Sequence, residues 1–255
     1  MVQTQVGSPI EGSHGRTIFA REFFDLQFTF AERVSALSEM PLEQALFQYT
    51  NLYIRFGLGR GFDLEHNGWR AYVDGLRTAE DGREWTYRFY LNDAEANTAP
   101  SVVATFGCFS YALNGNNVVR LHFQSTEPSG CSPLGASRDN ERRGELAALF
   151  AQLKAEVPGD LIVVGVSWLY NLHAYRRLFP PAYGASARTI HGLFRSMPLW
   201  GQFLNHRGEV KPIMSRSFLE AIAGQRSLAG LGICFPFQAV TVKAPVQTFC
   251  RFYGV

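Results

Sequence analysis

The chain has 255 residues, of which 46% are hydrophobic and 18% are charged, and its formal net charge at pH 7 is +2. This composition excludes an intrinsically disordered chain, which needs low hydrophobicity and high charge. The small net charge also argues against a dedicated duplex-binding protein, whose basic face dominates its charge count. The four cysteines form no CxxC pair, which favours free thiols over a zinc knuckle or a disulfide scaffold.

No stretch of the sequence has the pattern of a membrane span or a secretory signal. The apolar runs are all shorter than the roughly 18 residues that a spanning helix needs, and the first residues lack a charged segment followed by an apolar one. We therefore expect a cytoplasmic protein. Residues 1–16 are polar and contain Gly and Ser, which is typical of a mobile tail. Residues 17–255, which no linker divides, are expected to form a single globular domain.

Local patterns in the first half of the chain predict three helices, one of them short and centred on residues 69–76, and a strand. Thr29 and Glu32 have the spacing of a capping box, which predicts a short helix beginning there. Apolar residues at three- and four-residue steps over 41–56 predict a second helix. The segment 55–63 contains three glycines and two arginines, and it either ends this helix or forms a backbone nest for an anion. Residues 85–92 alternate and are rich in β-formers, which predicts a strand.

An antiparallel hairpin over residues 101–125 is the clearest local prediction. The Asn-Gly pair at 114–115 is a strong signal for a short hairpin connection. It separates β-forming segments that predict strands over 101–113 and 117–125. Because His122 alternates with apolar neighbours in the second strand, we expect its side chain on the opposite face from theirs.

The hairpin leads into a strand–loop–helix–strand crossover over residues 117–168. A long polar loop over 126–143 runs into an amphipathic helix at 140–156. The continuous apolar run 161–168 then predicts a strand that is covered on both faces, and a short helix follows at 172–179. Together the hairpin and the crossover predict a mixed sheet of the α+β or α/β class with helices packed around it.

The last quarter of the chain alternates between helical and extended patterns. Helices are expected over 191–205 and 215–225. The segment 233–245 predicts a strand with a proline interruption, and the last ten residues predict a terminal helical turn.

The crossover and the helix after it resemble the core of the GNAT acyltransferase superfamily. The order strand, loop, helix, strand, helix is shared. The segment 171–179 is similar to the family pattern N-x-x-A-x-x-L-Y, with Leu178 where the family has its tyrosine. The resemblance covers about residues 117–183. The family's loop motif, Q/R-x-x-G-x-G/A, does not occur in 126–143.

The resemblance implies a place where an acyl-CoA co-substrate would bind. In this family the loop and the start of the helix hold the donor's pyrophosphate, because free N–H groups and a partial positive charge gather there. Arginines beside the helix start add positive charge. The residues implied in donor binding are Gly130, Ser132, Gly135, Arg138, Arg142, Arg143 and Asn171.

The resemblance also implies an acyl-group transferase that uses an acyl-CoA or carrier-bound acyl donor and a small amine as acceptor. Strands splayed from the buried strand would admit the thioester, a backbone N–H would polarise its carbonyl, and a base would take the amine proton. His122 is the best-placed base because it lies on the strand before the loop, and His173 is the second. Tyr170 lies near the place of the family's tyrosine and is a further catalytic candidate.

Cys131 suggests a different enzyme mechanism. It lies in the sequence GCSPLG before a helix, where the helix dipole and neighbouring arginines would lower the pKa of a thiol. With His122 or His191 as its base, the thiolate could form an acyl-enzyme. The competing interpretation is an incidental loop cysteine.

The remaining signals are aromatic residues, histidines and arginines. The six histidines show no metal-ligand spacing, so no metal is expected. Arginines alternate with aromatic residues over 167–201, a mixture that suits single-stranded nucleic acid or an anionic small molecule, and the low net charge makes nucleic acid the weaker choice.

Aromatic residues make up 14% of the chain. They either fill the core or line a cavity, so the alternative function is a non-catalytic protein with an aromatic-lined pocket for an apolar or anionic small molecule. Both functions place the pocket among segments 122–138 and 168–183.

Overall fold

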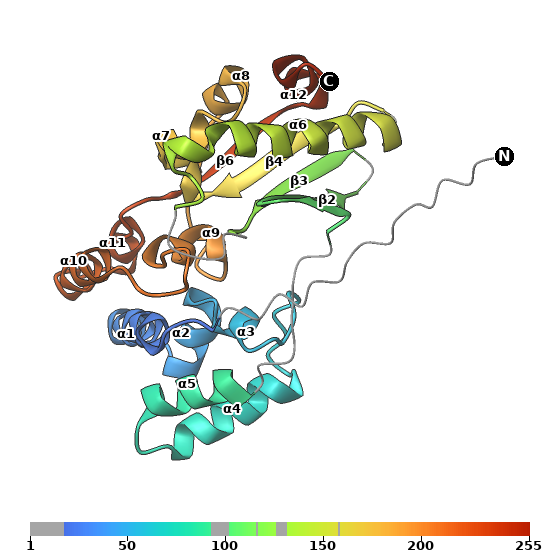
Figure 1. Ribbon diagram of the computed structural model, residues 1–255. Coiled ribbons are helices and arrows are strands. Elements are labelled where there is room, and N and C mark those ends of the chain that lie inside the picture. Colours follow the sequence, from blue (N-terminus) through green and yellow to red (C-terminus); the bar gives the residue numbers. More distant parts are fainter. Residues whose placement is uncertain (1–17, 93–101, 116, 126–131, 158) are drawn as a thin grey trace.

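The protein has a mixed α/β fold in which a six-stranded sheet lies beside a bundle of helices (Figure 1). The strand order is β1-β2-β3-β4-β6-β5, with antiparallel neighbours throughout except for the parallel pair β3 and β4. The mixed sheet with a hairpin and a crossover is therefore confirmed. The computed structural model describes residues 18–92, 102–115, 117–125, 132–157 and 159–255. The predicted tail, residues 1–16, lies outside them.

Five helices make up the described part of the N-terminal half. They are α1 (Arg21–Ser38), α2 (Leu42–Tyr49), α3 (Leu52–Arg55), α4 (Asn67–Thr78) and α5 (Gly82–Asn92). The capping box expected at Thr29 is wrong, because α1 begins eight residues earlier, at Arg21. Thr29 lies inside that helix, where its hydroxyl donates to the carbonyl of Asp25 at 2.9 Å. The helix expected over 41–56 is interrupted, since Asn51 donates its backbone N–H to the side chain of Gln27 at 2.9 Å.

The strand expected over 85–92 is also wrong, because this segment lies in helix α5. Its aromatic residues favour a strand locally, but tertiary packing overrides that propensity. Trp85 and Phe89 lie one helical turn apart, and Phe89 packs its ring 4.9 Å from Phe56 and 5.3 Å from Tyr72. The helix thus presents these rings to the core that α3 and α4 share.

The sheet is built from the hairpin and the crossover that the sequence predicts. Its strands are β1 (Ala104–Phe106), β2 (Phe109–Asn114), β3 (Val118–Phe123), β4 (Ile162–Ser167), β5 (Arg188–Ile190) and β6 (Ala239–Pro245). The turn at 114–115 joins β2 to β3, with Gly115 in the left-handed region at a φ of 68°. The strand expected over 101–113 is instead divided in two, because Gly107 has a φ of 56° and reverses the chain between β1 and β2.

The helices after the hairpin surround the sheet and connect it to the helical bundle. They are η1 (Ala136–Arg138), α6 (Asp139–Glu156), η2 (Trp168–Asn171), α7 (His173–Arg176), α8 (Pro181–Ala185), α9 (Met197–Trp200), η3 (Gly201–Phe203), α10 (Pro212–Ala223), α11 (Leu228–Ile233) and α12 (Val246–Tyr253). The crossover helix and the terminal helix agree with the predictions. The helix expected over 191–205 is limited to α9 and η3, and the strand expected over 233–245 begins only at Ala239, after α11 has ended.

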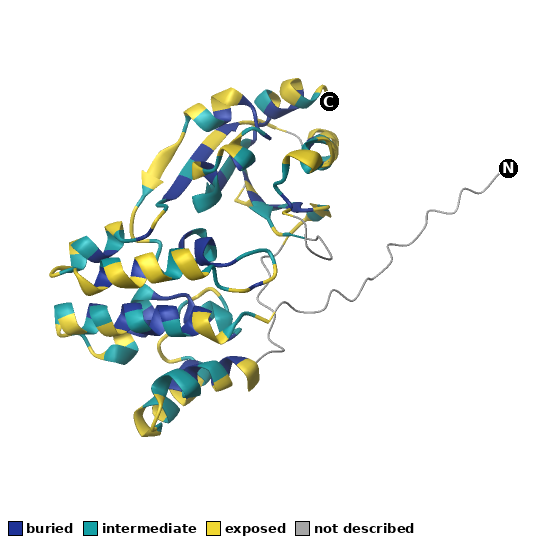
Figure 2. Cartoon of the chain, turned by 60° about the vertical axis from the view of Figure 1, so that its left-hand side comes forward, coloured by how far each residue is buried: buried dark blue, intermediate teal, exposed yellow. Residues whose placement is uncertain are grey.

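Two hydrophobic clusters form the interior (Figure 2). The first joins α1–α5 with α9, η3, α10 and α11, and the second lies between the sheet and α6, α7, α8 and α12. In the second cluster Phe150 of α6 stacks on Phe249 of α12 at 4.4 Å. Val119 and Leu121 of β3 belong to this cluster, so Arg120 and His122 point to the opposite face of the sheet, as the alternation predicts. The prediction of a single domain over 17–255 stays a prediction.

Among the described residues, no helix is long and apolar enough to cross a membrane. Of the four cysteines, Cys108, Cys234 and Cys250 are free thiols. Cys131 lies outside the described residues.

Candidate functional site

The parallel strands β3 and β4 stop pairing halfway along their length. The last pair in their register is Arg120 with Val164, whereas the strands continue for three more residues, to Phe123 and Ser167. On their outer edges both strands remain paired along their whole length, β3 with β2 and β4 with β6. The inner edges of residues 121–123 and 165–167 therefore face a gap in the ladder, which we call the strand opening.

The strand opening leaves backbone groups ready to bind an extended ligand. Within the described part of the chain, no β-ladder joins 121–123 to 165–167. Strand edges of this kind present N–H and C=O groups that need partners, and a ligand with amide groups can add to them as another strand would. The opening is thus a place where a linear, amide-containing chain could pass between the two faces of the sheet.

Two tyrosines pack against β4 at the opening. The hydroxyl oxygens of Tyr170 and Tyr183 lie 3.0 Å apart, and a Cβ on Gly165 would overlap with both of them. Burial raises the pKa of Tyr170 well above its ordinary value, and the neighbouring Tyr183 raises it further. The sequence proposed Tyr170 as a catalytic residue. Its hydroxyl is neutral and enclosed in the core, which favours a role in packing.

His122 lies on the section of β3 that borders the strand opening. It pairs with Ser110 of β2 and is half-buried on the sheet face that α6 does not cover. Burial lowers the pKa of His122 below its ordinary value, and the positive charges of Arg60 and then Arg120 lower it further. The imidazole is therefore neutral near pH 7 and able to accept a proton.

Arg60 also belongs to this site, although no pattern in the sequence connects it with His122. It lies in the glycine-rich segment 55–63, where Gly57 and Gly59 have φ values of 76° and 93°. These left-handed conformations turn the chain after α3, as helix-ending glycines do. The segment brings a positive charge close enough to act on His122, although the two residues are far apart in the sequence.

A second feature, the basic cleft, lies beside the first turns of α6. It is an open surface depression of about 580 Å³ whose lining includes Arg143, His173, Arg176 and Arg177. Arg143 comes from α6, and the other three come from α7 and the residue after it. Four groups that carry or can carry positive charge thus converge on one cavity, which suits a phosphorylated ligand.

The arginines of the basic cleft differ in their partners. Arg177 pairs with Asp139 at 2.5 Å and donates to the carbonyl of Leu134 at 3.2 Å. Arg143 donates to the carbonyl of Arg177, and its guanidinium also lies over the ring of Phe252 at 5.4 Å. These contacts fix both guanidinium groups in place. Arg176 is exposed, and its side chain has no ion pair or hydrogen bond to another described residue, so its charge remains available to a ligand.

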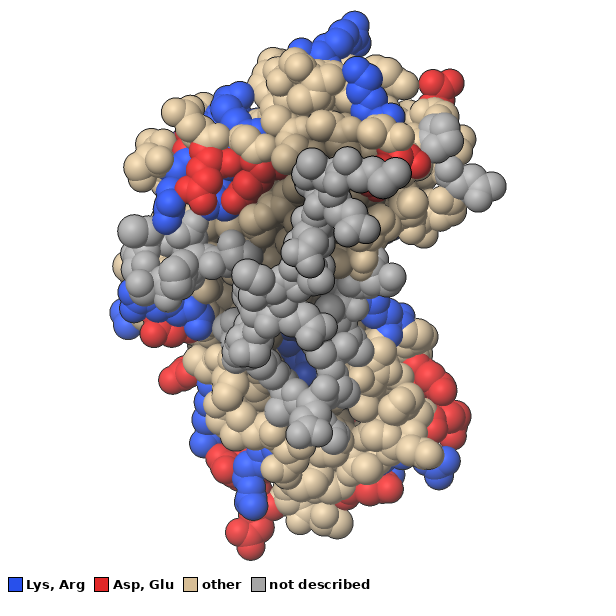
Figure 3. All heavy atoms as spheres, turned by 45° about the vertical axis from the view of Figure 1, so that its right-hand side comes forward, with Lys and Arg blue, Asp and Glu red and all other residues tan. Residues whose placement is uncertain are grey.

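Two of the predicted donor-binding arginines have structural partners instead. Arg142 is only 1% exposed and pairs with Glu145 at 2.6 Å and with Glu141 at 2.8 Å. Glu145 also accepts the backbone N–H of Cys108 at 3.1 Å, so this pair fastens α6 to the turn between β1 and β2. Arg138 pairs with Glu141 at 2.6 Å at the surface. Charges of both signs alternate on the face shown in Figure 3.

The remaining predicted residues are spread around these two features. The backbone carbonyl of Ser132 accepts the backbone N–H of Gly135 at 3.0 Å in the turn before η1. Asn171 donates through its side chain to the carbonyls of Trp168 at 2.7 Å and Gln238 at 2.9 Å, and so ties the end of β4 to the start of β6. The other two predicted residues, Gly130 and Cys131, lie outside the described residues.

Comparison with protein-family models, curated proteins and solved structures gives no match to this chain. The evidence for the function of the site is therefore the chemistry of its own residues. Among the described residues, no three His, Cys, Asp or Glu side chains form a cluster that could hold a metal ion.

The basic cleft and the strand opening belong to the same sheet and its covering helices. The basic cleft lies on the side of the sheet that α6 covers, and His122 lies on the other side. The strand opening lies in the sheet beside His122, and on the α6 side the buried Tyr170 and Tyr183 pack against it at Gly165. A long ligand that joined the cleft to His122 through the opening would have to displace these two tyrosine side chains.

Proposed function

We propose that the protein is an acyl-group transferase that takes an acyl group from acyl-CoA, or from a carrier-bound thioester, and passes it to a small amine. The observation that carries this proposal is the strand opening, where β3 and β4 stop pairing after Arg120 and Val164. A pantetheine arm is a linear chain with amide groups, and it can pair with the free strand edges in the opening. The thioester at the end of the arm would then lie beside His122.

The basic cleft supports the same donor. Its four basic side chains suit the phosphates of CoA. The order β3, η1, α6, β4, α7 also keeps the sequence of elements on which the resemblance to the GNAT superfamily rests. His173 lines the cleft, which favours donor binding over proton transfer as its role.

The proposed reaction uses His122 as general base. The nitrogen of the amine attacks the thioester carbonyl, a C–N bond forms, and the C–S bond breaks so that the thiolate leaves with the electron pair of that bond. The neutral imidazole of His122 takes the amine proton directly or through one water. Backbone N–H groups at the strand opening polarise the carbonyl oxygen as negative charge develops on it.

A thermal-shift titration with CoA and a series of acyl-CoAs tests the donor site. At a ligand concentration of 100 times Kd, binding stabilises the folded state by about 2.7 kcal/mol. For a chain of this size that corresponds to a rise in Tm on the order of 5–10 °C. The double variant R143Q/R176Q should reduce the shift, whereas R188Q, an exposed arginine outside the cleft, should not. Arg142 is left intact because it is buried. The absence of a saturable shift with any thioester would overturn the proposal.

A further inference from the structure

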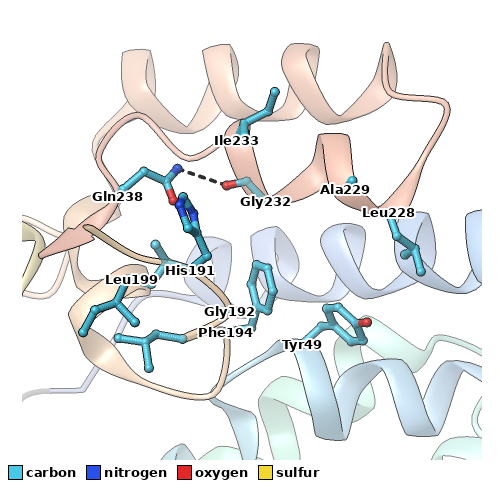
Figure 4. A pocket seen from close by; sticks show the side chains of 12 residues that line it. Tyr49, His191, Gly192, Phe194, Leu199, Leu228, Ala229, Gly232, Ile233 and Gln238 are labelled. Atoms are coloured by element: carbon cyan, nitrogen blue, oxygen red, sulfur yellow. Dashed lines mark hydrogen bonds between the residues drawn. The ribbon is translucent and has the colours of Figure 1, made fainter. Parts of the chain in front are cut away.

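A second cavity lies apart from the basic cleft, between α2, α9, α11 and the segment that follows β5 (Figure 4). Its volume is about 310 Å³, which is near the lower end for ligand pockets and leaves room for roughly ten water-sized groups. Among its lining residues are Tyr49, Phe194, Leu199 and Leu228. We call it the apolar pocket.

The wall of the apolar pocket is held by packing that does not depend on a ligand. Phe194 stacks 5.2 Å from Tyr49, and it also packs 5.7 Å from Phe30 and 6.0 Å from Phe235 in the helical core. Its carbonyl accepts the indole N–H of Trp200 at 2.6 Å. Because Phe194 is fixed from several sides, the cavity is a preformed one, as small-molecule sites usually are.

The pocket has one polar end. Figure 4 shows the imidazole of His191 beside the amide of Gln238 at one end, with Tyr49 and Leu228 at the other. Gln238 donates its amide N–H to the carbonyl of Gly232 at 3.0 Å, which fixes its orientation. His191 is exposed, and its side chain forms no hydrogen bond with another described residue, so a ring N–H can reach a ligand.

The charge of the lining restricts the ligand further. Among the residues that line the pocket there is no Lys, Arg, Asp or Glu, and His191 is the one histidine. His191 and Ile233 are exposed, so a single carboxylate at this end keeps part of its hydration while it accepts a hydrogen bond from His191, whereas a phosphate or a second carboxylate placed deeper would lose its hydration without gaining a charged partner. The pocket therefore differs in chemistry from the basic cleft and does not suit the phosphates of CoA.

We propose that the apolar pocket binds a small aliphatic or aromatic molecule with a single hydrogen-bond-accepting end, such as a medium-chain monocarboxylate. The apolar body would lie against Tyr49, Phe194 and Leu228, and the accepting end would receive a hydrogen bond from His191. This inference goes beyond the proposed acyl transfer and does not rest on it.

Substitutions at Gly232 give a graded test of the pocket. Gly232 lies in α11, and a Cβ built there would lie 3.6 Å from Phe194 Cζ, which is an ordinary van der Waals contact. G232A therefore keeps most of the cavity and serves as the matched control, whereas the longer side chain of G232L fills it. A229F fills the cavity from a neighbouring position on α11 and provides a second variant if G232L does not fold.

The measurement is an NMR titration of the His191 imidazole in the full chain, without any thioester, using octanoate, octanol and succinate as probes. Octanoate and octanol should shift the His191 signal saturably, and succinate should not. The affinity should fall at least tenfold in the cavity-filling variants and remain nearly unchanged in G232A. The inference is overturned if neither octanoate nor octanol gives a saturable shift, or if the filled variants bind them as the parent does.

Discussion

The hydroxyl oxygens of Tyr170 and Tyr183 lie 3.0 Å apart against the backbone of Gly165, at the point where β4 separates from β3. This close approach is possible because residue 165 has no side chain. The two tyrosines are buried and support the strand opening from the side of the core. The opening is therefore backed by rigid aromatic packing that links β4 to η2 and α8.

Gly165→Ala is expected to destabilise the protein. The added Cβ would overlap with the hydroxyl of Tyr170 and lie 2.5 Å from that of Tyr183, both of which are enclosed in the core. Overpacking of this kind costs about 1–3 kcal/mol. Urea unfolding of the variant measures the loss, and Y170F/Y183F in the same background should restore part of it. As the control, G144A adds a methyl group where nothing lies within 4 Å, so a comparable loss there would contradict the steric explanation.

Arg142→Met is expected to be far more destabilising than Arg138→Met. Arg142 is 1% exposed and pairs with Glu145, so its removal leaves a partly buried carboxylate without its charged partner. Breaking a buried pair costs about 3–5 kcal/mol, whereas a surface pair such as that of Arg138 contributes about 0–1 kcal/mol. Denaturant unfolding measures both losses. Adding E145Q to R142M should recover stability, and equal losses for the two single variants would contradict the structural role assigned to Arg142.

The fold was predictable where short-range signals decide it. The Asn-Gly signal at 114–115 correctly locates the hairpin, although Asn114 itself pairs with Val118, and the polar loop followed by an apolar stripe gives the crossover helix. Local sequence patterns gave a wrong secondary structure where tertiary packing determines it. The rings of Trp85 and Phe89 match a strand pattern, yet they lie in a helix because the core supplied by α3 and α4 receives them at helical spacing.

The candidate site was only partly predictable from the sequence, because it too depends on contacts between distant parts of the chain. Alternation along β3 placed His122 opposite its apolar neighbours, and the structure agrees. The influence of Arg60 on His122 depends on a long-range approach between the helical bundle and the sheet, which no local pattern encodes. Arg142 and Arg143 are adjacent in the sequence, yet only the orientation of α6 determines that Arg142 is buried and Arg143 lines the cleft.

His122 is expected to titrate below its ordinary pKa of 6.5 in the folded protein, because burial and the charges of Arg60 and Arg120 disfavour the imidazolium. NMR titration measures this pKa, and R60Q should raise it toward 6.5. The exposed surface residue Arg70 provides the control, since R70Q should leave it unchanged. A pKa at or above 6.5 in the parent chain would contradict the assigned environment.

The same shift predicts how stability depends on pH. Between the lowered folded pKa of His122 and its unfolded value of 6.5, the unfolded chain binds more protons than the folded one. The contribution of this group to the free energy of unfolding is therefore fully present above pH 6.5 and decreases as the pH falls through that window. Replacing His122 with Gln should flatten the stability profile there. If the free energy of unfolding depends on pH with the same slope in the parent and the variant, other groups cause the pH dependence.

Replacing His122 with Ala should remove turnover while leaving donor binding intact. Loss of a general base typically lowers the rate by about 10²–10⁴-fold. The basic cleft lies on the other side of the sheet, so the thermal shift with acyl-CoA should persist in H122A. H173A should show the opposite pattern, with a raised KM for the donor and little change in kcat, because His173 lines the cleft. An unchanged kcat in H122A would remove His122 from the mechanism, and an equal loss of donor binding would assign it a structural role instead.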